Sequence, residues 1–153
     1  MRLVVQRVTR AAVHADGEPL GEIERGAVVL VGVAPSDDAA LADRMADKLV
    51  GLRYFDDSEG RTNLAIDDAD GAYLVVSQFT LYADLRRGRR PGFTTAAAPE
   101  LAEPIVERFA DRLRSHGVDV ESGRFGAAME VELVNDGPFT LVLDSDRDLS
   151  GSG

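Results

Sequence analysis

The sequence predicts a single-domain α+β protein with mixed or antiparallel, barrel-like β-sheets and two main helices. Two observations lead to this prediction. Strand-like and helix-like segments follow in the order strands, helix, strand, helix, strands, without the regular alternation of a parallel α/β sheet. The 153 residues also contain no internal repeat and no linker, which is typical of one domain. We expect this domain to occupy residues 1–144, and we expect the polar residues 145–153 to form a disordered tail.

The N-terminal region is expected to form two β-strands. Residues 2–15 are largely apolar, with an imperfect alternation near Arg7 and Arg10 that indicates a bulge or a bend. An Asp-Gly pair then indicates a turn, and a short return strand follows over residues 20–23.

A buried strand and a helix are expected next. Residues 27–34 are almost continuously apolar, which is typical of a strand that is buried on both faces. Ser36 provides a capping hydroxyl, and the two aspartates after it place acidic groups in the first turn of a helix. Apolar residues at helical spacing predict that this helix continues to about Arg53 and packs on the core.

The middle of the chain is expected to contain a long loop, a strand and the second helix. Residues 55–70 are polar and turn-rich, with a short strand or helical turn near residues 64–66. Residues 73–81 are expected to form a central strand. The second helix begins at one of two prolines, Pro99 or Pro104, and ends before a glycine. Its expected apolar stripe consists of Leu101, Ile105, Phe109 and Leu113.

Two apolar strands, over residues 129–134 and 139–143, are expected near the C-terminal end, with Gly137-Pro138 between them. Proline fixes its own φ and has no N–H, and the glycine before it adopts angles that other residues resist. The spacing alone favours a tight turn between antiparallel strands. The alternative is a cis Gly-Pro peptide that aims carbonyl groups at a ligand, although only about one X-Pro bond in twenty is cis.

Charge is unevenly distributed. The net charge of −10, taken alone, argues against a nucleic-acid partner, because phosphate binding needs a basic surface. A local basic loop on an acidic body can nevertheless bind a polyanion. Four arginines fall close together in such a loop, namely Arg86, Arg87, Arg89 and Arg90.

The residues that are missing restrict the chemistry. The chain has no cysteine, which excludes disulfides, thiolate nucleophiles and zinc–thiolate sites. His14 and His116 lie in no metal-ligand motif, so we expect neither a metal nor a cofactor. The absence of cysteine is compatible with a reducing cytoplasm. No apolar run approaches the length of a membrane span and no signal-peptide pattern is present, so we expect no membrane partner.

Polar residues appear abruptly at the end of the expected central strand, at Ser77, Gln78 and Thr80. Buried polar groups destabilise a fold unless they have partners, so such a cluster is either a satisfied network or a site. A hydroxyl, an amide and main-chain N–H groups could bind the carbonyl oxygen of an ester and its developing oxyanion. The alternative is a set of polar residues that caps a sheet edge.

Two motifs together resemble the signature motifs of the D-aminoacyl-tRNA deacylase family. They are Ser-Gln-Phe-Thr-Leu at 77–81 and Asn-Asp-Gly-Pro-Phe-Thr at 135–140. The opening Met-Arg-Leu-Val-Val-Gln-Arg-Val, the Arg90-Pro91 pair and residues 123–129 also match, so the resemblance extends to about Leu143. The chain departs from the pattern at Gly92, where many members have serine, and in its acidic tail.

The resemblance implies an activity and an assembly. Members of the family hydrolyse the ester between a D-amino acid and the terminal adenosine of tRNA, and they also remove glycine from mischarged tRNA. They are cytoplasmic homodimers with the active site at the subunit interface. By resemblance, Asn135 belongs to the motif in which Gly137-Pro138 is a cis peptide that enters the partner's pocket. Its carbonyl groups hold the α-amino group and leave no space for an L side chain, and Arg7 supports the motif.

The resemblance also assigns the pocket. Ser77, Gln78, Phe79 and Thr80 match its floor. Thr80 is one candidate nucleophile, but no general base is evident beside it in the sequence. We favour a second possibility, in which the neighbouring ribose hydroxyl assists water and the N–H groups of Phe79 and Thr80 stabilise the oxyanion.

Other residues have two possible roles. Phe125 and Met129 either line the adenine pocket or pack in the core. The four arginines are candidate tRNA phosphate contacts, and their alternative is a solvated loop. Two further functions remain open: a non-catalytic module that binds the tRNA 3′ end, and an esterase for small D-amino acid esters.

Overall fold

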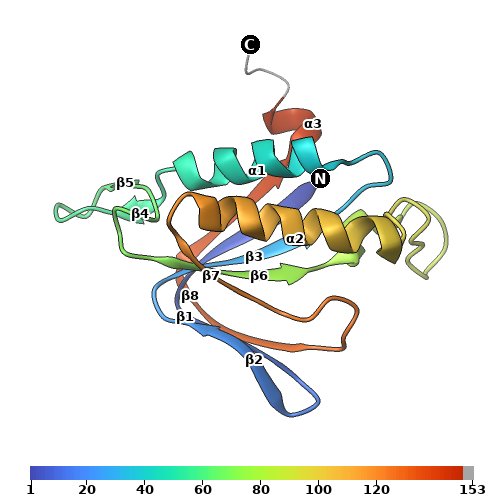
Figure 1. Ribbon diagram of the computed structural model, residues 1–153, viewed down its shortest axis with the longest axis horizontal. Helices are drawn as coiled ribbons and strands as arrows, with labels where there is room; N and C mark the ends of the chain where they lie inside the picture. The colour runs from blue at the N-terminus through green and yellow to red at the C-terminus, as the bar shows by residue number, and fades with distance from the viewer. Residues whose placement is uncertain (150–153) are drawn as a thin grey trace.

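Strand β1 is the centre of the sheet, because three other strands pair with it (Figure 1). Our computed structural model describes residues 1–149. Neighbouring strands run in the order β2-β1-β3-β6-β7, and β8 also pairs with β1. The β1 pairs are antiparallel, whereas β3–β6 and β6–β7 are parallel. These strands are β1 (Arg2–Ala15), β2 (Glu18–Ile23), β3 (Gly26–Gly32), β6 (Ala72–Ser77), β7 (Asp119–Ser122) and β8 (Glu130–Asp144).

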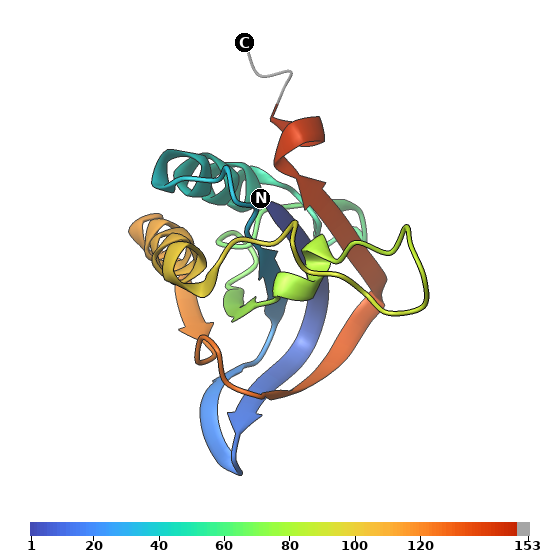
Figure 2. The same cartoon turned by 90° about the vertical axis from the view of Figure 1, so that its right-hand side faces the viewer.

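Two helices, α1 (Ala39–Gly51) and α2 (Pro99–Ser115), lie side by side on one face of the sheet (Figures 1 and 2). The mixed sheet is nearly closed into a barrel, so the expected fold class is confirmed. A separate small sheet consists of β4 (Phe55–Asp56) and β5 (Thr62–Leu64). Within residues 1–149, no helix is long and apolar enough to cross a membrane.

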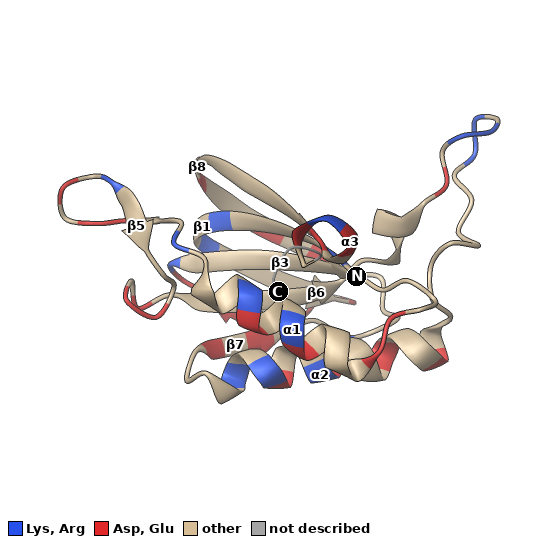
Figure 3. Ribbon diagram, turned by 90° about the horizontal axis from the view of Figure 1, so that it is seen from above, with Lys and Arg blue, Asp and Glu red and all other residues tan. Residues whose placement is uncertain are grey.

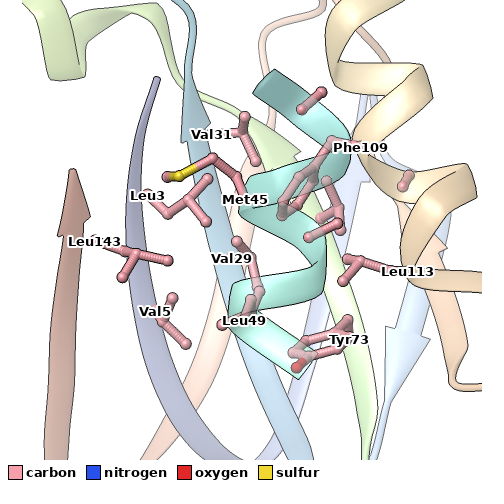
Figure 4. Packing of buried hydrophobic residues seen from close by; sticks show 14 of the residues in the cluster. Leu3, Val5, Val29, Val31, Met45, Leu49, Tyr73, Phe109, Leu113 and Leu143 are labelled. Carbon is pink, nitrogen blue, oxygen red and sulfur yellow. The ribbon is translucent and has the colours of Figure 1, made fainter. Parts of the chain in front are cut away.

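The main core lies between the helices and the sheet, and Figure 4 shows its packing. A second, smaller cluster occupies the opposite face of the sheet, where β1, β2 and β8 curl over β3 and β6. The strands that separate the two clusters are buried on both faces, which is why residues 27–34 are apolar without alternation. The sheet contributes side chains that face the helices, among them Leu3, Val5, Val29 and Val31. The helices contribute Met45 and Leu49 from α1 and Phe109 and Leu113 from α2.

Several element boundaries differ from the prediction. Helix α1 begins two residues later than expected, because Asp38 is its N-cap and accepts a hydrogen bond from the N–H of Leu41 at 2.8 Å. The preceding Asp37 is buried and forms an ion pair with the N-terminal amine at 2.8 Å. Helix α2 begins at Pro99, and Leu101 of the expected stripe is exposed. Strand β7 was not predicted.

The C-terminal region contains the largest corrections. The bulge expected in β1 is present, but β8 is one continuous strand and not two strands joined by a hairpin turn. The expected disorder is wrong for residues 145–149, because α3 (Ser145–Asp148) is helical and both Ser145 and Leu149 are buried. Residues 150–153 of the expected tail lie outside the described residues.

Candidate active site

The pocket floor, which we define as residues 77–80, begins where β6 ends. The predicted strand over 73–81 is wrong after Ser77, because Gln78 turns the chain and η1 (Phe79–Tyr82), a 3-10 helix, follows. Gln78 donates its N–H to the carbonyl oxygen of Val31 at 2.7 Å. A Cβ atom on residue 32 would lie 2.9 Å from the Cβ of Leu81, so η1 packs this closely on β3 because Gly32 has no side chain.

Arg2 fixes η1 from the other side. It donates from Nη1 to the carbonyl oxygen of Leu81 at 2.7 Å, and its guanidinium lies 4.8 Å from the ring centre of Tyr82. Its Nε donates to Asp144 at 2.8 Å. The contacts that hold the floor in place therefore involve Gln78, Leu81 and Tyr82. They leave the side chains of Ser77 and Phe79 free to line the space above the floor.

Two main-chain N–H groups of the floor have no acceptor in the part of the chain that the structure describes. They belong to Phe79 and Thr80, at the start of η1, where the first N–H groups of a helix have no intrahelical partner. The hydroxyl of Thr80, in contrast, accepts a hydrogen bond from the side-chain amide of Gln78. The arrangement thus offers two neighbouring N–H donors and a hydroxyl that is already engaged.

A pocket of about 560 Å³ opens beside the floor, between the ends of β3 and β6, the start of α2 and residues 125–131. Ser77, Gln78 and Phe79 of the predicted site line it, together with Phe125 and Met129, but Thr80 does not. None of the described residues that line it has an ionisable side chain. The remaining lining residues are Val31, Val33, Val76, Phe93, Ala96, Ala97, Ala98, Pro99, Ala102, Val106, Gly126, Ala127 and Val131.

Phe125 and Met129 are wall residues of this pocket and also pack against the buried clusters, whereas contact with adenine stays a prediction. A Cβ on Gly123 would lie 2.7 Å from the sulfur of Met129, so this glycine leaves room for the thioether. The wall also contains Phe93, whose ring meets that of Phe79 edge-on at 5.0 Å. Phe93 was not predicted as a site residue. An aromatic residue three positions after Arg90 could have indicated one.

The second motif stands out from the sheet as the Gly-Pro bulge, residues 136–139. In the β1–β8 pairing, Gln6 faces Thr140 and Val8 faces Asn135, so four residues of β8 oppose one residue of β1. The Gly137-Pro138 peptide is cis, and both residues are exposed. The side chain of Asn135 closes the bulge: its Nδ2 donates to the carbonyl oxygen of Phe139 at 2.9 Å, and its Oδ1 accepts from the Phe139 N–H at 3.1 Å.

Arg7 supports the bulge from inside the fold. Its Nε donates to the carbonyl oxygen of Asp136 at 3.0 Å, and its Nη1 donates to that of Tyr54 at 2.8 Å. The guanidinium lies 4.6 Å from the ring centre of Phe139. Arg7 is only 7% exposed, so it is a buried residue of β1 and not a surface strand residue. Tyr54 is the neighbour that sequence reasoning missed.

The structure does not bring the two motifs together within one chain. Neither Gly137 nor Pro138 lines the pocket beside the floor. Arg7 and Asn135 accompany the bulge and are also absent from the pocket wall. The site therefore has two separate parts, one that offers N–H donors and one that presents exposed backbone on a braced bulge.

The arginine loop, residues 85–91, projects from the body, as the blue segment in Figure 3 shows. Its base is closed by a bridge in which Asp84 and Gly92 exchange hydrogen bonds of 2.7 and 3.0 Å. Asp84 also binds Arg86 at 2.8 Å, and this hydrogen bond lowers the pKa of Asp84 to about 2. Within residues 1–149, the other three arginines of the loop have no carboxylate partner. They are Arg87, Arg89 and Arg90.

The family model and two curated relatives that match this chain are all named as tRNA deacylases. Residues 4–144 match the family model described as D-Tyr-tRNA(Tyr) deacylase. The chain is 58% identical to a D-aminoacyl-tRNA deacylase of Symbiobacterium thermophilum over 96% of this chain and 97% of that one. It is 54% identical to a protein of the same name from Roseiflexus castenholzii, over 95% and 92% of the two chains.

Two solved structures share the fold. One, named as a c-Myc DNA unwinding element binding protein, has a TM-score of 0.88 and 38% identity over 95% of this chain and 99% of that one. The other, named as a probable eukaryotic D-amino acid tRNA deacylase, has a TM-score of 0.82 over 93% and 97% of the chains, at 16% identity. Together with the family model and the close relatives, the fold and the two motifs show that the chain belongs to the D-Tyr-tRNA(Tyr) deacylase family of hydrolases.

Proposed function

We propose that this protein hydrolyses the ester of D-aminoacyl-tRNA and releases the D-amino acid and tRNA. The observation that carries the proposal is a pair of N–H groups, on Phe79 and Thr80, that have no acceptor among the described residues, beside a pocket whose described lining has no ionisable side chain. Such donors stabilise the oxyanion of a tetrahedral intermediate when they are fixed before the reaction. The names of the relatives from Symbiobacterium thermophilum and Roseiflexus castenholzii support the choice of substrate.

The reaction needs little from the side chains of the protein. The base of the terminal adenosine lies against Phe125 and Met129, and the ester carbonyl oxygen accepts from the N–H groups of Phe79 and Thr80. Water attacks the carbonyl carbon, the bond to the ribose oxygen breaks, and that oxygen leaves with a proton. The neighbouring ribose hydroxyl assists the water, because the pocket wall provides no general base and the Thr80 hydroxyl is engaged by Gln78.

The Gly-Pro bulge supplies the chiral filter to a second copy of the chain. It is exposed, braced by Arg7 and Asn135, and absent from its own pocket, which favours insertion into the pocket of a partner. Backbone carbonyl groups are directed acceptors for the α-ammonium group of the substrate. Backbone close to the α-carbon leaves no space for an L side chain. Glycine has no side chain, so it passes the same filter and is a second substrate.

An apolar strip provides a surface for this homodimer. Val142 of β8 is 50% exposed, and the strand register places it beside Val4, which in turn pairs with Leu30. Phe79, at the floor, is 56% exposed. Exposed apolar side chains that adjoin a site are typical of an interaction surface. Association through them would carry the bulge of one subunit towards the floor of the other.

The cytoplasmic location remains a prediction from the family resemblance.

The arginine loop binds the phosphate backbone of the tRNA. Its projection from an acidic body concentrates positive charge at one place, which suits a polyanion despite the net charge of −10. Arg87, Arg89 and Arg90 are the stronger candidates, because Arg86 is neutralised by Asp84.

Turnover distinguishes the enzyme from the alternatives. D-tyrosyl-tRNA in large excess over protein should be deacylated over many cycles, whereas L-tyrosyl-tRNA should decay at the rate of the protein-free control. A module that only binds the tRNA 3′ end would protect both esters. The 38% identical solved structure is named as a DNA-element-binding protein, and binding without turnover would favour a role of that class. An esterase for small D-amino acid esters would show no dependence on the tRNA body.

A further inference from the structure

Tyr54 contacts the Gly-Pro bulge through its ring. The rings of Tyr54 and Phe139 are stacked, with centres 6.1 Å apart and planes 17° from parallel. The guanidinium of Arg7 lies 4.6 Å from the centre of the Phe139 ring. Phe139, the last residue of the bulge, is thus in contact with a planar ring and a cation, and each interaction has a preferred geometry. Movement of Tyr54 would therefore shift the residue that ends the bulge.

Tyr54 contacts the bulge a second time, through its main chain. Its carbonyl oxygen accepts from Nη1 of Arg7 at 2.8 Å, and Nε of the same guanidinium donates to the carbonyl oxygen of Asp136 at 3.0 Å. Because the guanidinium is planar, these two bonds fix its orientation together. Tyr54 therefore acts on both ends of the bulge, on Phe139 directly and on Asp136 through Arg7.

The other side of Tyr54 is anchored in the main core. Tyr54 is 2% exposed and its ring centre lies 4.6 Å from that of Phe55. Its hydroxyl lies 3.5 Å from the hydroxyl of Tyr73, a long and weak contact, and Tyr73 faces the helices in Figure 4. Burial raises the pKa of Tyr54 to about 12, so the side chain is uncharged at neutral pH. The ring, more than the hydroxyl, therefore connects the core to the bulge.

We propose that Tyr54 is a positioning residue that determines how strictly the Gly-Pro bulge rejects L-aminoacyl esters. This inference rests on the proposed function and deepens it. Rejection of an L side chain by backbone depends on the position of that backbone, and a displacement of about 1 Å changes a reaction rate by about a hundredfold. Tyr54 itself makes no contact with the substrate. It acts by holding Phe139 and Arg7, and through them the bulge.

Two substitutions at the same position separate the ring from the hydroxyl. Tyr54→Phe keeps the stack on Phe139 and removes only the weak contact with Tyr73. Tyr54→Leu keeps an apolar side chain in the core and removes the stack. The quantity to measure is the ratio of kcat/KM for L-tyrosyl-tRNA to that for D-tyrosyl-tRNA. We expect Tyr54→Leu to raise this ratio about tenfold or more, and we expect Tyr54→Phe to leave it unchanged.

A control for general loosening comes from the same core. Phe109 on α2 is fully buried, and among residues 1–149 no ring contact joins it to Phe139, so Phe109→Leu removes a similar ring from the core and leaves the stack of Tyr54 on Phe139 in place. Its selectivity ratio should equal that of the original protein, even where thermal unfolding shows a comparable loss of stability. If Tyr54→Leu and Phe109→Leu have the same ratio, Tyr54 is only a core residue and the inference is overturned.

A second variant covers the case in which Tyr54→Leu does not fold. Phe139→Leu removes the same stack from its half-buried side and should raise the ratio in the same direction. An unchanged ratio in Phe139→Leu would also overturn the inference. The failure of the proposed function looks different, because the original protein would then not turn over D-tyrosyl-tRNA at all.

Discussion

The pocket floor and the Gly-Pro bulge both expose main-chain groups, which are N–H donors at the floor and, in the proposed function, carbonyl acceptors at the bulge. Two N–H donors of the floor, on Phe79 and Thr80, have no partner among residues 1–149, whereas the bulge presents exposed backbone around Gly137-Pro138. In both regions the main chain is available to a ligand, and side chains of neighbouring residues hold it in place. The braces are Arg2 at the floor and Arg7 with Asn135 at the bulge.

The two regions differ in how they are held. The bulge is fixed by directed hydrogen bonds from a buried arginine and an asparagine. The floor combines the hydrogen bond from Arg2 with close packing, because Gly32 permits η1 to approach β3. Because the geometry of both regions depends on residues around them, substitutions of these supporting residues should reduce activity more than substitutions of side chains near the substrate.

Asn135→Ala should have the largest effect. The change removes three hydrogen bonds, two to Phe139 and one to the carbonyl oxygen of Arg7, so the bulge loses its closure. Deacylation of D-tyrosyl-tRNA should fall about a hundredfold, as expected for loss of positioning. Gln6→Ala is the matched control, because the side chain of Gln6 links the same two strands through an exposed 3.4 Å contact with Thr140. Steady-state kinetics of both variants measure the difference, and equal rates would refute the bracing role.

Gly32→Ala should have the next largest effect. The new Cβ would lie 2.9 Å from the Cβ of Leu81, so η1 must move away from β3 and carry the N–H groups of the floor with it. We expect kcat to fall about tenfold with little change in tRNA binding. Gly51→Ala is the control, because nothing lies within 4 Å of a Cβ at that position. A normal kcat in Gly32→Ala would mean that the floor does not depend on this packing.

Substitutions in the arginine loop should affect binding and leave chemistry intact. Arg89→Gln with Arg90→Gln should weaken tRNA binding several-fold and reduce the slope of log K against log salt by about 1.5, since each phosphate contact contributes about 0.7–0.9. Arg86→Gln should change the slope less, because Asp84 already binds Arg86. Binding titrations at several salt concentrations measure both slopes. Equal slopes in all variants would make the loop a solvated surface feature.

Thr80→Ala should have the smallest effect, within about threefold of the original kcat, because the variant keeps the N–H of residue 80. It removes only a hydroxyl that is bonded to Gln78 and is absent from the pocket wall. Single-turnover deacylation of bound D-tyrosyl-tRNA gives the rate directly. Loss of chemistry with intact binding would identify Thr80 as the nucleophile.

The sequence predicted the local features of these regions better than their long-range partners. The irregularity near Arg7 predicted the bulge in β1 correctly, because the pattern break lies within the strand itself. The prediction of a hairpin at Gly137-Pro138 was wrong, because β8 pairs with β1 on both sides of this peptide. The sequence does not distinguish a turn from a bulge at a Gly-Pro pair, because the strand that pairs with it lies at the other end of the chain. The strand predicted over residues 73–81 was too long, since β6 ends at Ser77. Apolar periodicity carries no information on the contact between Gly32 and Leu81 that accompanies this end.

Some residues of the candidate site could be predicted from the sequence, and others could not. Ser77, Gln78 and Phe79 stood out because polar groups interrupt an apolar run, and they line the pocket. Tyr54 gave no such signal, because an aromatic residue before a loop is ordinary and its partner Phe139 is distant in sequence.

In the proposed reaction, the protein supplies main-chain donors and the substrate supplies the assisting hydroxyl. The most direct test compares D-tyrosyl-tRNA with the same tRNA ending in 2′-deoxyadenosine and esterified at the 3′ position, under single-turnover conditions. We predict that the deoxy substrate binds normally and is deacylated at least about a hundredfold more slowly. Equal rates for the two substrates would contradict the account and would require a general base from the protein.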